Sequence, residues 1–331
     1  MREDDRLLAE ACAIADQIGD DGGPTVRDRH DARSPAERQM RALADMIHAW
    51  RGQHASRREG TPRAWGPLCI LQQIGEGAFS KVFRAVDVRN GREVALKLLK
   101  CGPWPSEAIA RAIIEDSRAL CRVRHANVIA VYGAASHDSR MGIWMERLHG
   151  CTLEERLGRL GPVAARDAIL IGLDVCRGTA AVHRAGLLHG DIKAQNVVQA
   201  DDGRLVLIDI GGIAWGGGRA SARPPLTGTP LCLAPEVLDR KPATVRSEVY
   251  SIGVLLYHLV TGAYPVSGRT LPDLRAAHAS GRRRPLAECR PHLPGGLVAV
   301  VERALAHDPS RRYAGVPALQ GALASLTGEA G

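Results

Sequence analysis

Residues 187–211 hold a group of oxygen-bearing side chains that could bind a divalent metal ion. Asp191 and Asn196 lie in one polar loop, and Asp209 follows a predicted β-hairpin whose turn is Asp201-Asp202-Gly203. The hairpin could fold these three side chains onto one spot. Hard oxygen ligands of this kind suit Mg²⁺, which takes few protein ligands together with phosphate oxygens. The stretch therefore predicts a site for Mg²⁺ and a phosphate compound.

The same stretch resembles the catalytic loop and the metal-binding turn of the protein kinases. In that family His-Arg-Asp-Leu-x-x-x-Asn is followed by Asp-Phe-Gly; here the motifs read His-Gly-Asp-Ile-Lys-Ala-Gln-Asn at 189–196 and Asp-Ile-Gly at 209–211. The resemblance implies that Asp191 is the catalytic base and that Asn196 and Asp209 hold Mg²⁺. From these residues alone, a polar loop in an unrelated α+β domain is the alternative.

A glycine-rich turn, Gly75-Glu76-Gly77, lies between two predicted strands. Glycine lets backbone N–H groups approach a phosphate without a Cβ clash. In a dinucleotide-binding fold such a turn would open a helix, whereas the following residues, Val82 to Ala85, look like a strand. The pattern favours the phosphate-covering loop of a kinase, with Ser80 in place of its third glycine.

The next predicted strand carries Val94-Ala95-Leu96-Lys97, which resembles the Val-Ala-Ile-Lys motif of the kinases. The resemblance implies that Lys97 binds the α- and β-phosphates of ATP; a lysine at a strand edge is the alternative. The family pairs this lysine with a glutamate on the following helix. The kinase register places Asp116 at that position, and Glu115 lies about 100° around the helix. Both residues are candidates for the partner of Lys97. The alternative is that both are acidic residues on the protein surface.

Residues 143–148 resemble the strand and hinge that hold adenine in the kinases. The resemblance implies that Met145 guards the back of the nucleotide pocket, and that the backbones of Glu146 and Leu148 form hydrogen bonds with the base. The residues expected around the nucleotide are Ile74, Gly75, Gly77, Val82, Ala95, Lys97, Met145, Glu146, Leu148, Val198 and Asp209.

Two further pairs match features of the family. Lys193 and Thr229 are typical of its serine/threonine subclass, in which the lysine neutralises the γ-phosphate and the threonine braces the loop against Asp191. The Ala-Pro-Glu sequence that ends at Glu236 resembles the end of an activation segment, and Arg312 is expected to pair with Glu236 inside the larger lobe.

Two positions depart from the family pattern. Gly190 stands where many kinases have an arginine that could pair with a phosphorylated activation segment. Our hypothesis is that activity does not require phosphorylation of Ser221 or Thr227. Glu248 replaces the aspartate that usually binds the backbone of the catalytic loop, and its side chain is one methylene longer.

The composition excludes several other classes. The formal charge of +8 is spread along the chain, with one run of three arginines at 282–284, which argues for a solvated basic surface and against nucleic-acid binding. No window is apolar for the length of a membrane span. The eight cysteines form no Cys-x-x-Cys pair, so neither a zinc site nor a disulfide framework is indicated. A cytoplasmic location is the expectation.

The resemblance covers residues 65–326 and implies an α+β, two-lobed fold. We expect a helical appendage at 1–63, a small lobe with an antiparallel sheet at 64–147, and a mostly helical lobe at 148–331. The implied function is ATP- and Mg²⁺-dependent transfer of phosphate to Ser or Thr of protein substrates. A pseudokinase scaffold and a small-molecule phosphotransferase are the alternatives, and the appendage is a candidate for binding a partner protein.

Overall fold

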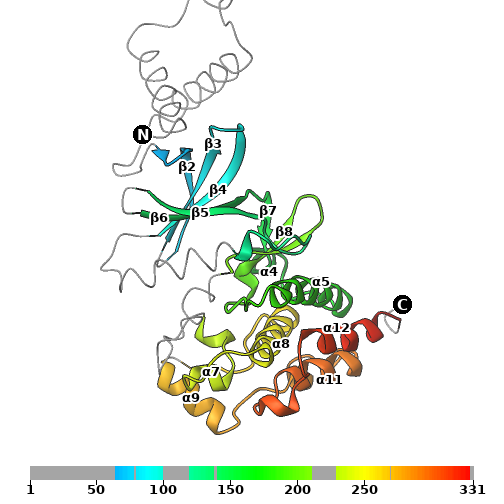
Figure 1. Cartoon of the computed structure of the whole chain (residues 1–331). Coiled ribbons are helices and arrows are strands. Elements are labelled where there is room, and N and C mark those ends of the chain that lie inside the picture. Colours follow the sequence, from blue (N-terminus) through cyan, green and yellow to red (C-terminus); the bar gives the residue numbers. More distant parts are fainter. Residues whose placement is uncertain are drawn as a thin grey trace, which may run out of the picture. The chain divides into compact units, whose positions relative to one another are not determined.

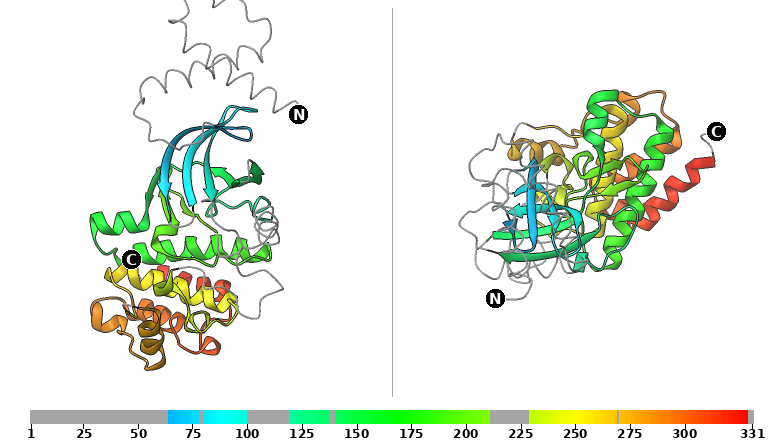
Figure 2. Two further views of the ribbon diagram at one scale, coloured as in Figure 1. Left: turned by 90° about the vertical axis from the view of Figure 1, so that its left-hand side faces the viewer. Right: turned by 90° about the horizontal axis from the view of Figure 1, so that it is seen from above.

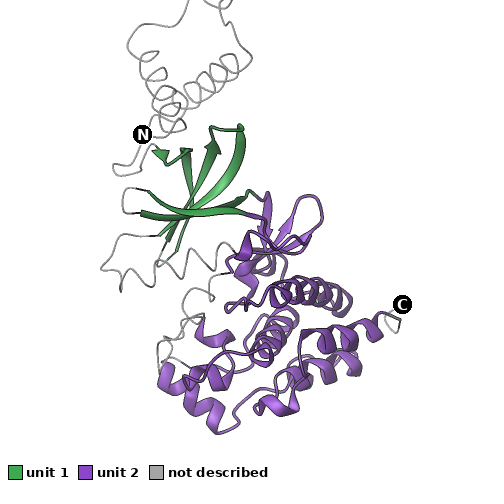
Figure 3. Ribbon diagram, viewed as in Figure 1, with its two compact units in different colours: residues 1–103, 132–147 green, residues 104–131, 148–331 purple. Residues whose placement is uncertain are grey.

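The computed structural model of the chain (Figure 1) describes residues 64–77, 80–99, 119–137, 140–210, 229–268 and 270–328. The chain divides into two compact units, coloured separately in Figure 3. The N-terminal unit is formed by residues 1–103 and 132–147, and the C-terminal unit by residues 104–131 and 148–331. Several predicted features lie outside the described residues, namely the appendage at 1–63, Glu115, Asp116, Gly211, Ser221 and Thr227.

The N-terminal unit is built on a six-stranded sheet of order β1-β2-β3-β4-β6-β5. The pairings β1–β2, β2–β3, β3–β4 and β4–β6 are antiparallel. The strands are β1 (Ala64–Trp65), β2 (Leu68–Glu76), β3 (Ser80–Asp87), β4 (Arg92–Leu99), β5 (Val131–His137) and β6 (Arg140–Glu146).

Alternation along β4 gives this sheet two different faces, because successive side chains of a strand point to opposite sides. Val94, Leu96 and Leu98 are buried in the hydrophobic core of the unit. Ala95 and Lys97, which lie between them, are half-buried. The sheet therefore presents one packed face and one more accessible face, and Lys97 lies on the accessible one.

The C-terminal unit contains a small antiparallel sheet of order β7-β8-β9 and most of the helices. The strands are β7 (Gly150–Thr152), β8 (Val197–Ala200) and β9 (Leu205–Leu207). The α-helices are α4 (Leu153–Leu160), α5 (Ala165–Arg184), α7 (Pro235–Leu238), α8 (Val245–Thr261), α9 (Leu271–Ala279), α10 (Leu286–Cys289), α11 (Gly295–Ala304) and α12 (Val316–Ala324). The 3-10 helices are η2 (Ala194–Asn196), η3 (Pro230–Cys232), η4 (Pro309–Arg311) and η5 (Ser325–Gly328).

Helices α5 and α8 lie side by side at the centre of this unit (Figure 2). Every residue of α8 from 247 to 260 except Ser251 is buried, as expected of an internal helix that is apolar nearly all round. The long helix of this unit is α5. Just before its N-cap, the N–H of Val163 donates to the carbonyl of Leu259 at 2.9 Å, which ties the start of α5 to α8.

Helix α4 begins at a capping box formed by Thr152 and Glu155. The side chain of Thr152 accepts a hydrogen bond from the N–H of Glu155, and the Glu155 carboxylate accepts one from the N–H of Thr152. This reciprocal pair satisfies two backbone donors at the helix start. It also fixes the direction in which the chain leaves β7.

The described part of the chain has no helix that is long and apolar enough to cross a membrane. It also holds no group of three or more His, Cys, Asp or Glu side chains placed to bind a metal ion. Its six cysteines are free. Burial raises the pKa of the Cys176 thiol to about 12, so this thiol is protonated at neutral pH.

Candidate active site

Asp191 follows α5 and lies at the centre of a hydrogen-bond network. Its Oδ1 accepts a hydrogen bond from the backbone N–H of Thr229 at 3.0 Å. Its Oδ2 accepts hydrogen bonds from Nζ of Lys193 at 2.6 Å and from Nδ2 of Asn196 at 2.8 Å. The side chain is 18% exposed. The carboxylate is thus held by donors from three residues and still reaches solvent.

Lys193 connects the loop of Asp191 to the segment that precedes η3. Its Nζ donates to Oγ1 of Thr229 at 2.6 Å as well as to Asp191. The backbone carbonyl of Thr229 accepts from the N–H of Cys232 at 2.8 Å, which ties Thr229 into the turn of η3. The structure therefore brings together Asp191, Lys193 and Thr229, which the sequence had placed in two separate motifs.

Asn196 joins the catalytic loop to the strand that leads to Asp209. The turn of η2 is closed by a hydrogen bond from the N–H of Asn196 to the carbonyl of Lys193 at 2.9 Å. The carbonyl of Asn196 in turn accepts from the N–H of Ile208 at 2.9 Å. Asp209 follows directly, with a φ of 57° and an exposed side chain. The predicted hairpin, β8 and β9, thus ends with Asp209 next to the Asn196 loop.

The donor set around Asn196 fits a hard cation. Its amide nitrogen donates both to the carbonyl and to Oδ2 of Asp191, each at 2.8 Å, so the amide oxygen is the atom available to a metal ion. Together with the Asp209 carboxylate this gives two oxygen donors, the ligand type that Mg²⁺ prefers, with coordination positions left for phosphate oxygens.

Glu248 supports the loop from the buried helix α8. Its Oε1 accepts a hydrogen bond from the N–H of Gly190 at 2.7 Å, and its Oε2 contacts Nε2 of His183 on α5. Gly190 has a φ of 78°, a left-handed conformation that glycine adopts without a Cβ penalty. The longer Glu248 side chain therefore reaches the loop backbone, as predicted. Sequence reasoning did not identify His183, because it lies 65 residues before its partner.

His189 is fully buried below the loop. Its Nδ1 accepts a hydrogen bond from the N–H of Asp191 at 3.4 Å, and its Nε2 has no partner among the described residues. Burial lowers the pKa of His189, and the negative charges of Glu248, Asp191 and Asp209 oppose this effect. The imidazole is thus neutral at neutral pH and acts as packing for the loop.

The predicted pair of Glu236 and Arg312 is present inside the C-terminal unit. Two parallel hydrogen bonds join Nη1 to Oε1 at 2.7 Å and Nη2 to Oε2 at 2.8 Å. Ser247 adds a third donor to Glu236 at 2.9 Å. The guanidinium also donates to three backbone carbonyls and lies 4.9 Å from the ring centre of Tyr250. Every strong donor of this arginine is therefore used within the fold.

In the N-terminal unit, the candidate nucleotide residues gather on one sheet face. Lys97 of β4 is paired with Val82 of β3 and with Ile143 of β6. Ala95 is paired with Met145. Directly paired residues of antiparallel strands share a face, and so do residues two apart along one strand. Val82, Ala95, Lys97 and Met145 consequently lie together on the accessible face of the sheet.

The glycine-rich turn connects β2 to β3. The N–H of Gly77 donates to the carbonyl of Ser80 at 2.8 Å, and Gly75 is paired with Val82. The register shifts between Gln73 and Gly75, so Ile74 forms an irregularity in the strand and its side chain is 45% exposed. An exposed apolar side chain beside this turn suits contact with a flat ligand.

The end of β6 is held by a charged cluster that sequence reasoning missed. Glu93 of β4 accepts two hydrogen bonds from Arg84 and forms an ion pair with Arg147, the residue that follows Glu146. Burial lowers the pKa of Arg147, and the charge of Arg84 adds to this. The signal in the sequence was opposite charges on neighbouring predicted strands. The cluster anchors the backbone of the predicted hinge to the sheet.

Two remaining candidates lie in the C-terminal unit. Leu148 is half-buried, and Val198 of β8 is 9% exposed and is paired with Thr152 and Val206. Lys97 belongs to one unit and Asp209 to the other, and their binding of one nucleotide stays a prediction.

Comparison with known proteins identifies the class to which this fold and site belong. A family model described as the protein kinase domain matches residues 68–322. The chain therefore belongs to the protein kinase family, and the predicted family and α+β fold class are confirmed.

The chain is similar to several bacterial members of this family. It is 31% identical over 261 residues to the serine/threonine-protein kinase PknL of Mycobacterium bovis, a match that covers 78% of this chain and 65% of PknL. It is 27% identical over 252 residues to PrkC of Bacillus subtilis, covering 76% of this chain and 39% of PrkC. The matches therefore span less than two thirds of the length of these relatives.

A solved structure shows the same fold. The crystal structure of the Mycobacterium tuberculosis PknI kinase domain matches with a TM-score of 0.64 and 21% sequence identity, over 81% of this chain and 99% of that one.

Proposed function

We propose that this protein is a serine/threonine protein kinase that transfers the γ-phosphoryl group of ATP to protein hydroxyls. The observation that carries the proposal is the network in which Lys193 and Thr229 bind Asp191 while Asn196 binds the same carboxylate. A lysine that contacts both the candidate base and a threonine of the following segment suits a Ser or Thr acceptor. Membership of the family and the names of the relatives support the same activity.

In the proposed reaction, Asp191 orients the acceptor hydroxyl and takes its proton. The hydroxyl oxygen forms a bond to the γ-phosphorus as the bond from that phosphorus to the β–γ bridging oxygen breaks, and ADP leaves. Lys193 neutralises charge on the γ-phosphoryl group. Positioning and electrostatic stabilisation supply most of the rate, because the transition state of phosphoryl transfer is loose.

Mg²⁺, held by the Asn196 amide oxygen and the Asp209 carboxylate, would neutralise the phosphate oxygens. On the N-terminal unit, Lys97 would bind the α- and β-phosphates. Ile74, Val82, Ala95 and Met145 would contact the base and sugar, and the backbones of Gly75 and Gly77 would cover the phosphates. Glu146 and Leu148 would supply backbone hydrogen bonds to adenine, and Val198 would pack below it.

Nothing in the comparisons favours a scaffold without activity or a small-molecule phosphotransferase. The identity of the protein substrates, a partner for residues 1–63, the domain boundaries at 63 and 147, the pairing of Lys97 with Asp116 or Glu115, and the cytoplasmic location stay predictions.

The test is phosphate transfer from γ-radiolabelled ATP to a generic basic protein. We expect wild type to label the protein and Asp191→Ala to lower the rate by about 10²–10⁴-fold, the usual contribution of a general base. Asp201→Ala, at an exposed aspartate of the nearby hairpin turn, is the matched control and keeps the wild-type rate. ATP binding by wild type without transfer to any acceptor would refute the proposal.

A further inference from the structure

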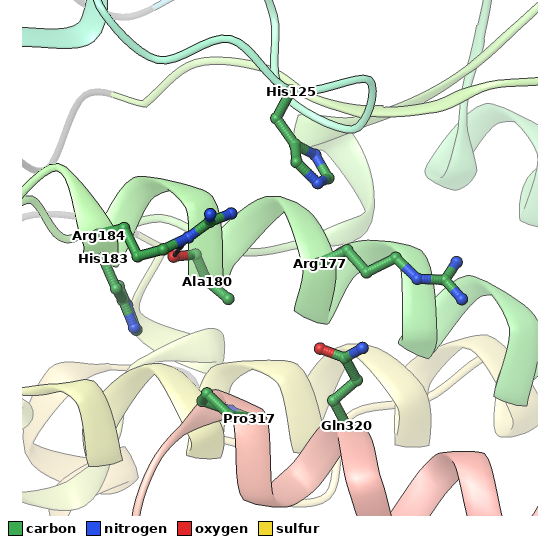
Figure 4. Close-up of a pocket in the computed structure, with 7 residues that line it drawn as sticks. All are labelled: His125, Arg177, Ala180, His183, Arg184, Pro317 and Gln320. Atoms are coloured by element: carbon green, nitrogen blue, oxygen red, sulfur yellow. Dashed lines mark hydrogen bonds between the residues drawn. The ribbon is translucent and has the colours of Figure 1, made fainter.

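The C-terminal half of α5 borders two cavities whose linings include arginine and histidine side chains. The first has a volume of about 400 Å³, and its lining includes His125, Arg177, His183 and Arg184 (Figure 4). The second has a volume of about 390 Å³, and its lining includes Arg122, Arg124 and Arg184. Arg184 thus belongs to both. We call this surface, formed by Arg122, Arg124, His125, Arg177, His183 and Arg184, the arginine groove.

The sequence of α5 explains why the surface is hollow. Arg177, Ala180, Ala181 and Arg184 follow the i, i+3, i+4, i+7 spacing that places residues on one helix face. The two alanines are small, and they lie between two long side chains. Figure 4 shows His125 on a loop on one side of α5 and Gln320 of α12 on the opposite side of α5. The cavities are therefore a consequence of helix periodicity combined with small residues.

The charge of the groove is strongly one-sided. Among the described residues, no Asp or Glu lines either cavity. Arg177 is paired with Asp174 at 2.6 Å, and His183 contacts Glu248. Arg122, Arg124 and Arg184 form no salt bridge with any described residue. The carbonyl end of α5 contributes only about half a negative charge, so these arginines outweigh it.

His125 adds a neutral donor to the groove. Its Nδ1 accepts a hydrogen bond from the N–H of Asn127 at 3.1 Å, which places the proton of the neutral ring on Nε2. Burial lowers the pKa of His125, the charges of Arg184 and Arg177 lower it further, and Asp174 opposes them. The positive charges of Arg177 and Arg184 therefore both lower the pKa of the His125 ring. An anion placed between the two arginines would relieve their mutual repulsion.

We propose that the arginine groove binds a phosphorylated Ser or Thr side chain of a protein segment. A phosphate monoester carries nearly two negative charges and three acceptor oxygens, and guanidinium groups bind it through two parallel hydrogen bonds. The described residues of the linings include no Phe, Tyr or Trp on which a nucleic-acid base would stack. The choice of a Ser or Thr ester rests on the proposed function, because that reaction produces this group.

The test is fluorescence anisotropy of the full chain with a labelled peptide library that has phosphothreonine at its centre and mixed residues around it. The same library with threonine is the reference. We expect the phosphorylated library to bind at least about tenfold more tightly, inorganic phosphate to compete, and the ring signals of His125 in NMR spectra to shift on titration.

Variants then locate the site. Arg184→Ala, and independently Arg122→Ala, should weaken binding of the phosphorylated library by about tenfold. Arg166→Ala is the matched control, because Arg166 is an exposed arginine of the same helix that lines neither cavity. Thermal melting checks that all three variants are folded. Equal loss in Arg184→Ala and Arg166→Ala would overturn the proposal, as would equal affinity for the two libraries.

The outcome is separable from that of the proposed kinase activity. Asp191→Ala should bind the phosphorylated library as tightly as wild type, because Asp191 lines neither cavity. If wild type transfers no phosphate but still binds phosphothreonine through Arg184, the kinase proposal fails and the groove stands. If it transfers phosphate and shows no preference for phosphothreonine, the groove proposal fails alone.

Discussion

The C-terminal unit contains two carboxylates that are surrounded by similar donors and exposed to different degrees. Asp191 accepts from Lys193, Asn196 and Thr229, and both Asp191 and Lys193 are 18% exposed. Glu236 accepts from Arg312 and Ser247; this carboxylate is 11% exposed and the arginine is 0% exposed. Both arrangements are carboxylates held by a cation and a hydroxyl or amide. They differ most in the cation, because Lys193 reaches solvent and Arg312 does not.

This difference separates a reactive group from a structural one. A fully enclosed ion pair contributes to the fold because neither charge can be solvated if its partner is removed. A half-enclosed pair costs less to break and can exchange its partners for a substrate. We therefore expect changes at Arg312 to act on stability and changes at Lys193 to act on catalysis, and the following predictions test this contrast.

The largest effect is expected for Arg312→Met, which leaves the Glu236 carboxylate buried without its cation. The free energy of unfolding should fall by about 3–5 kcal/mol, measured by urea denaturation. Arg311→Met changes an exposed neighbour and should stay within about 0.5 kcal/mol of wild type. If both variants were equally stable, the pair would have no structural role.

Lys193→Met should act in the opposite way. It removes one positive group from the site of the proposed reaction, so kcat/KM should fall by about 10²–10³-fold. The melting temperature should change little, because a partly exposed ion pair contributes at most about 1 kcal/mol. Lys241→Met, at an exposed lysine after α7, serves as the control in both assays. A variant that melted early and kept its turnover would contradict the comparison.

Gly190→Ala tests the backbone of the loop next to Asp191, where the N–H of Gly190 donates to Glu248. The left-handed φ of 78° should cost an alanine about 1–2 kcal/mol of stability. Gly158→Ala is the matched change within helix α4, where a new Cβ meets no atom within 4 Å, and there alanine should add about 0.5–1 kcal/mol. Calorimetric melting of both variants measures whether each change lowers or raises stability. If Gly190→Ala left the stability unchanged, this loop would be able to relax around an alanine.

The last effect concerns pH and the surroundings of Arg312. Burial lowers the pKa of His278 to about 4, and the nearby charges of His307 and Arg312 add to this while Asp239 and Glu236 oppose it. Between the ordinary histidine pKa, about 6.5, and pH 4, the unfolded chain binds a proton that the folded chain does not. The contribution of His278 to the free energy of unfolding should therefore be complete above about pH 6.5. It should be lost progressively as the pH falls from about 6.5 to about 4.

His278→Gln should reduce this pH dependence by at most about 1.4 kcal/mol per pH unit. The measurement is urea unfolding at a series of pH values, with His292→Gln as a control at an exposed histidine. An unchanged slope in His278→Gln would mean that the imidazole is protonated in the folded chain as readily as in the unfolded one. The ring of Tyr250 contacts both His278 and Arg312, so the result reports on the buried cluster.

Local sequence patterns predicted much of the site. The hairpin after Asn196, the capping box of α4 and the buried helix α8 each follow from neighbouring residues, since turn chemistry, caps and helix periodicity act over a few positions. The bracing of Asp191 by Thr229 was expected from the resemblance to the family and from no local pattern, because the two residues lie 38 positions apart.

Other features left no local signal. His183 supports Glu248 across 65 positions, and the anchor of the hinge joins Glu93 to Arg147. Each pairing depends on which helices and strands become neighbours in the fold. The residue types at the paired positions do not predict this arrangement. The pairing of Lys97 with Asp116 or Glu115 stays a prediction, because both acidic residues lie outside the described residues.

By itself the sequence determined the membership of the chain in its family, the fold class and the identity of the candidate reactive groups, because these depend on residue types at short, regular spacings. Tertiary structure decided which charges are enclosed and which are accessible. Asp191 and Glu236 are both acidic residues beside a cation; the cation of Asp191, Lys193, is 18% exposed, whereas the cation of Glu236, Arg312, is 0% exposed. The arginine groove has the same origin, since packing alone decides which arginines find a partner.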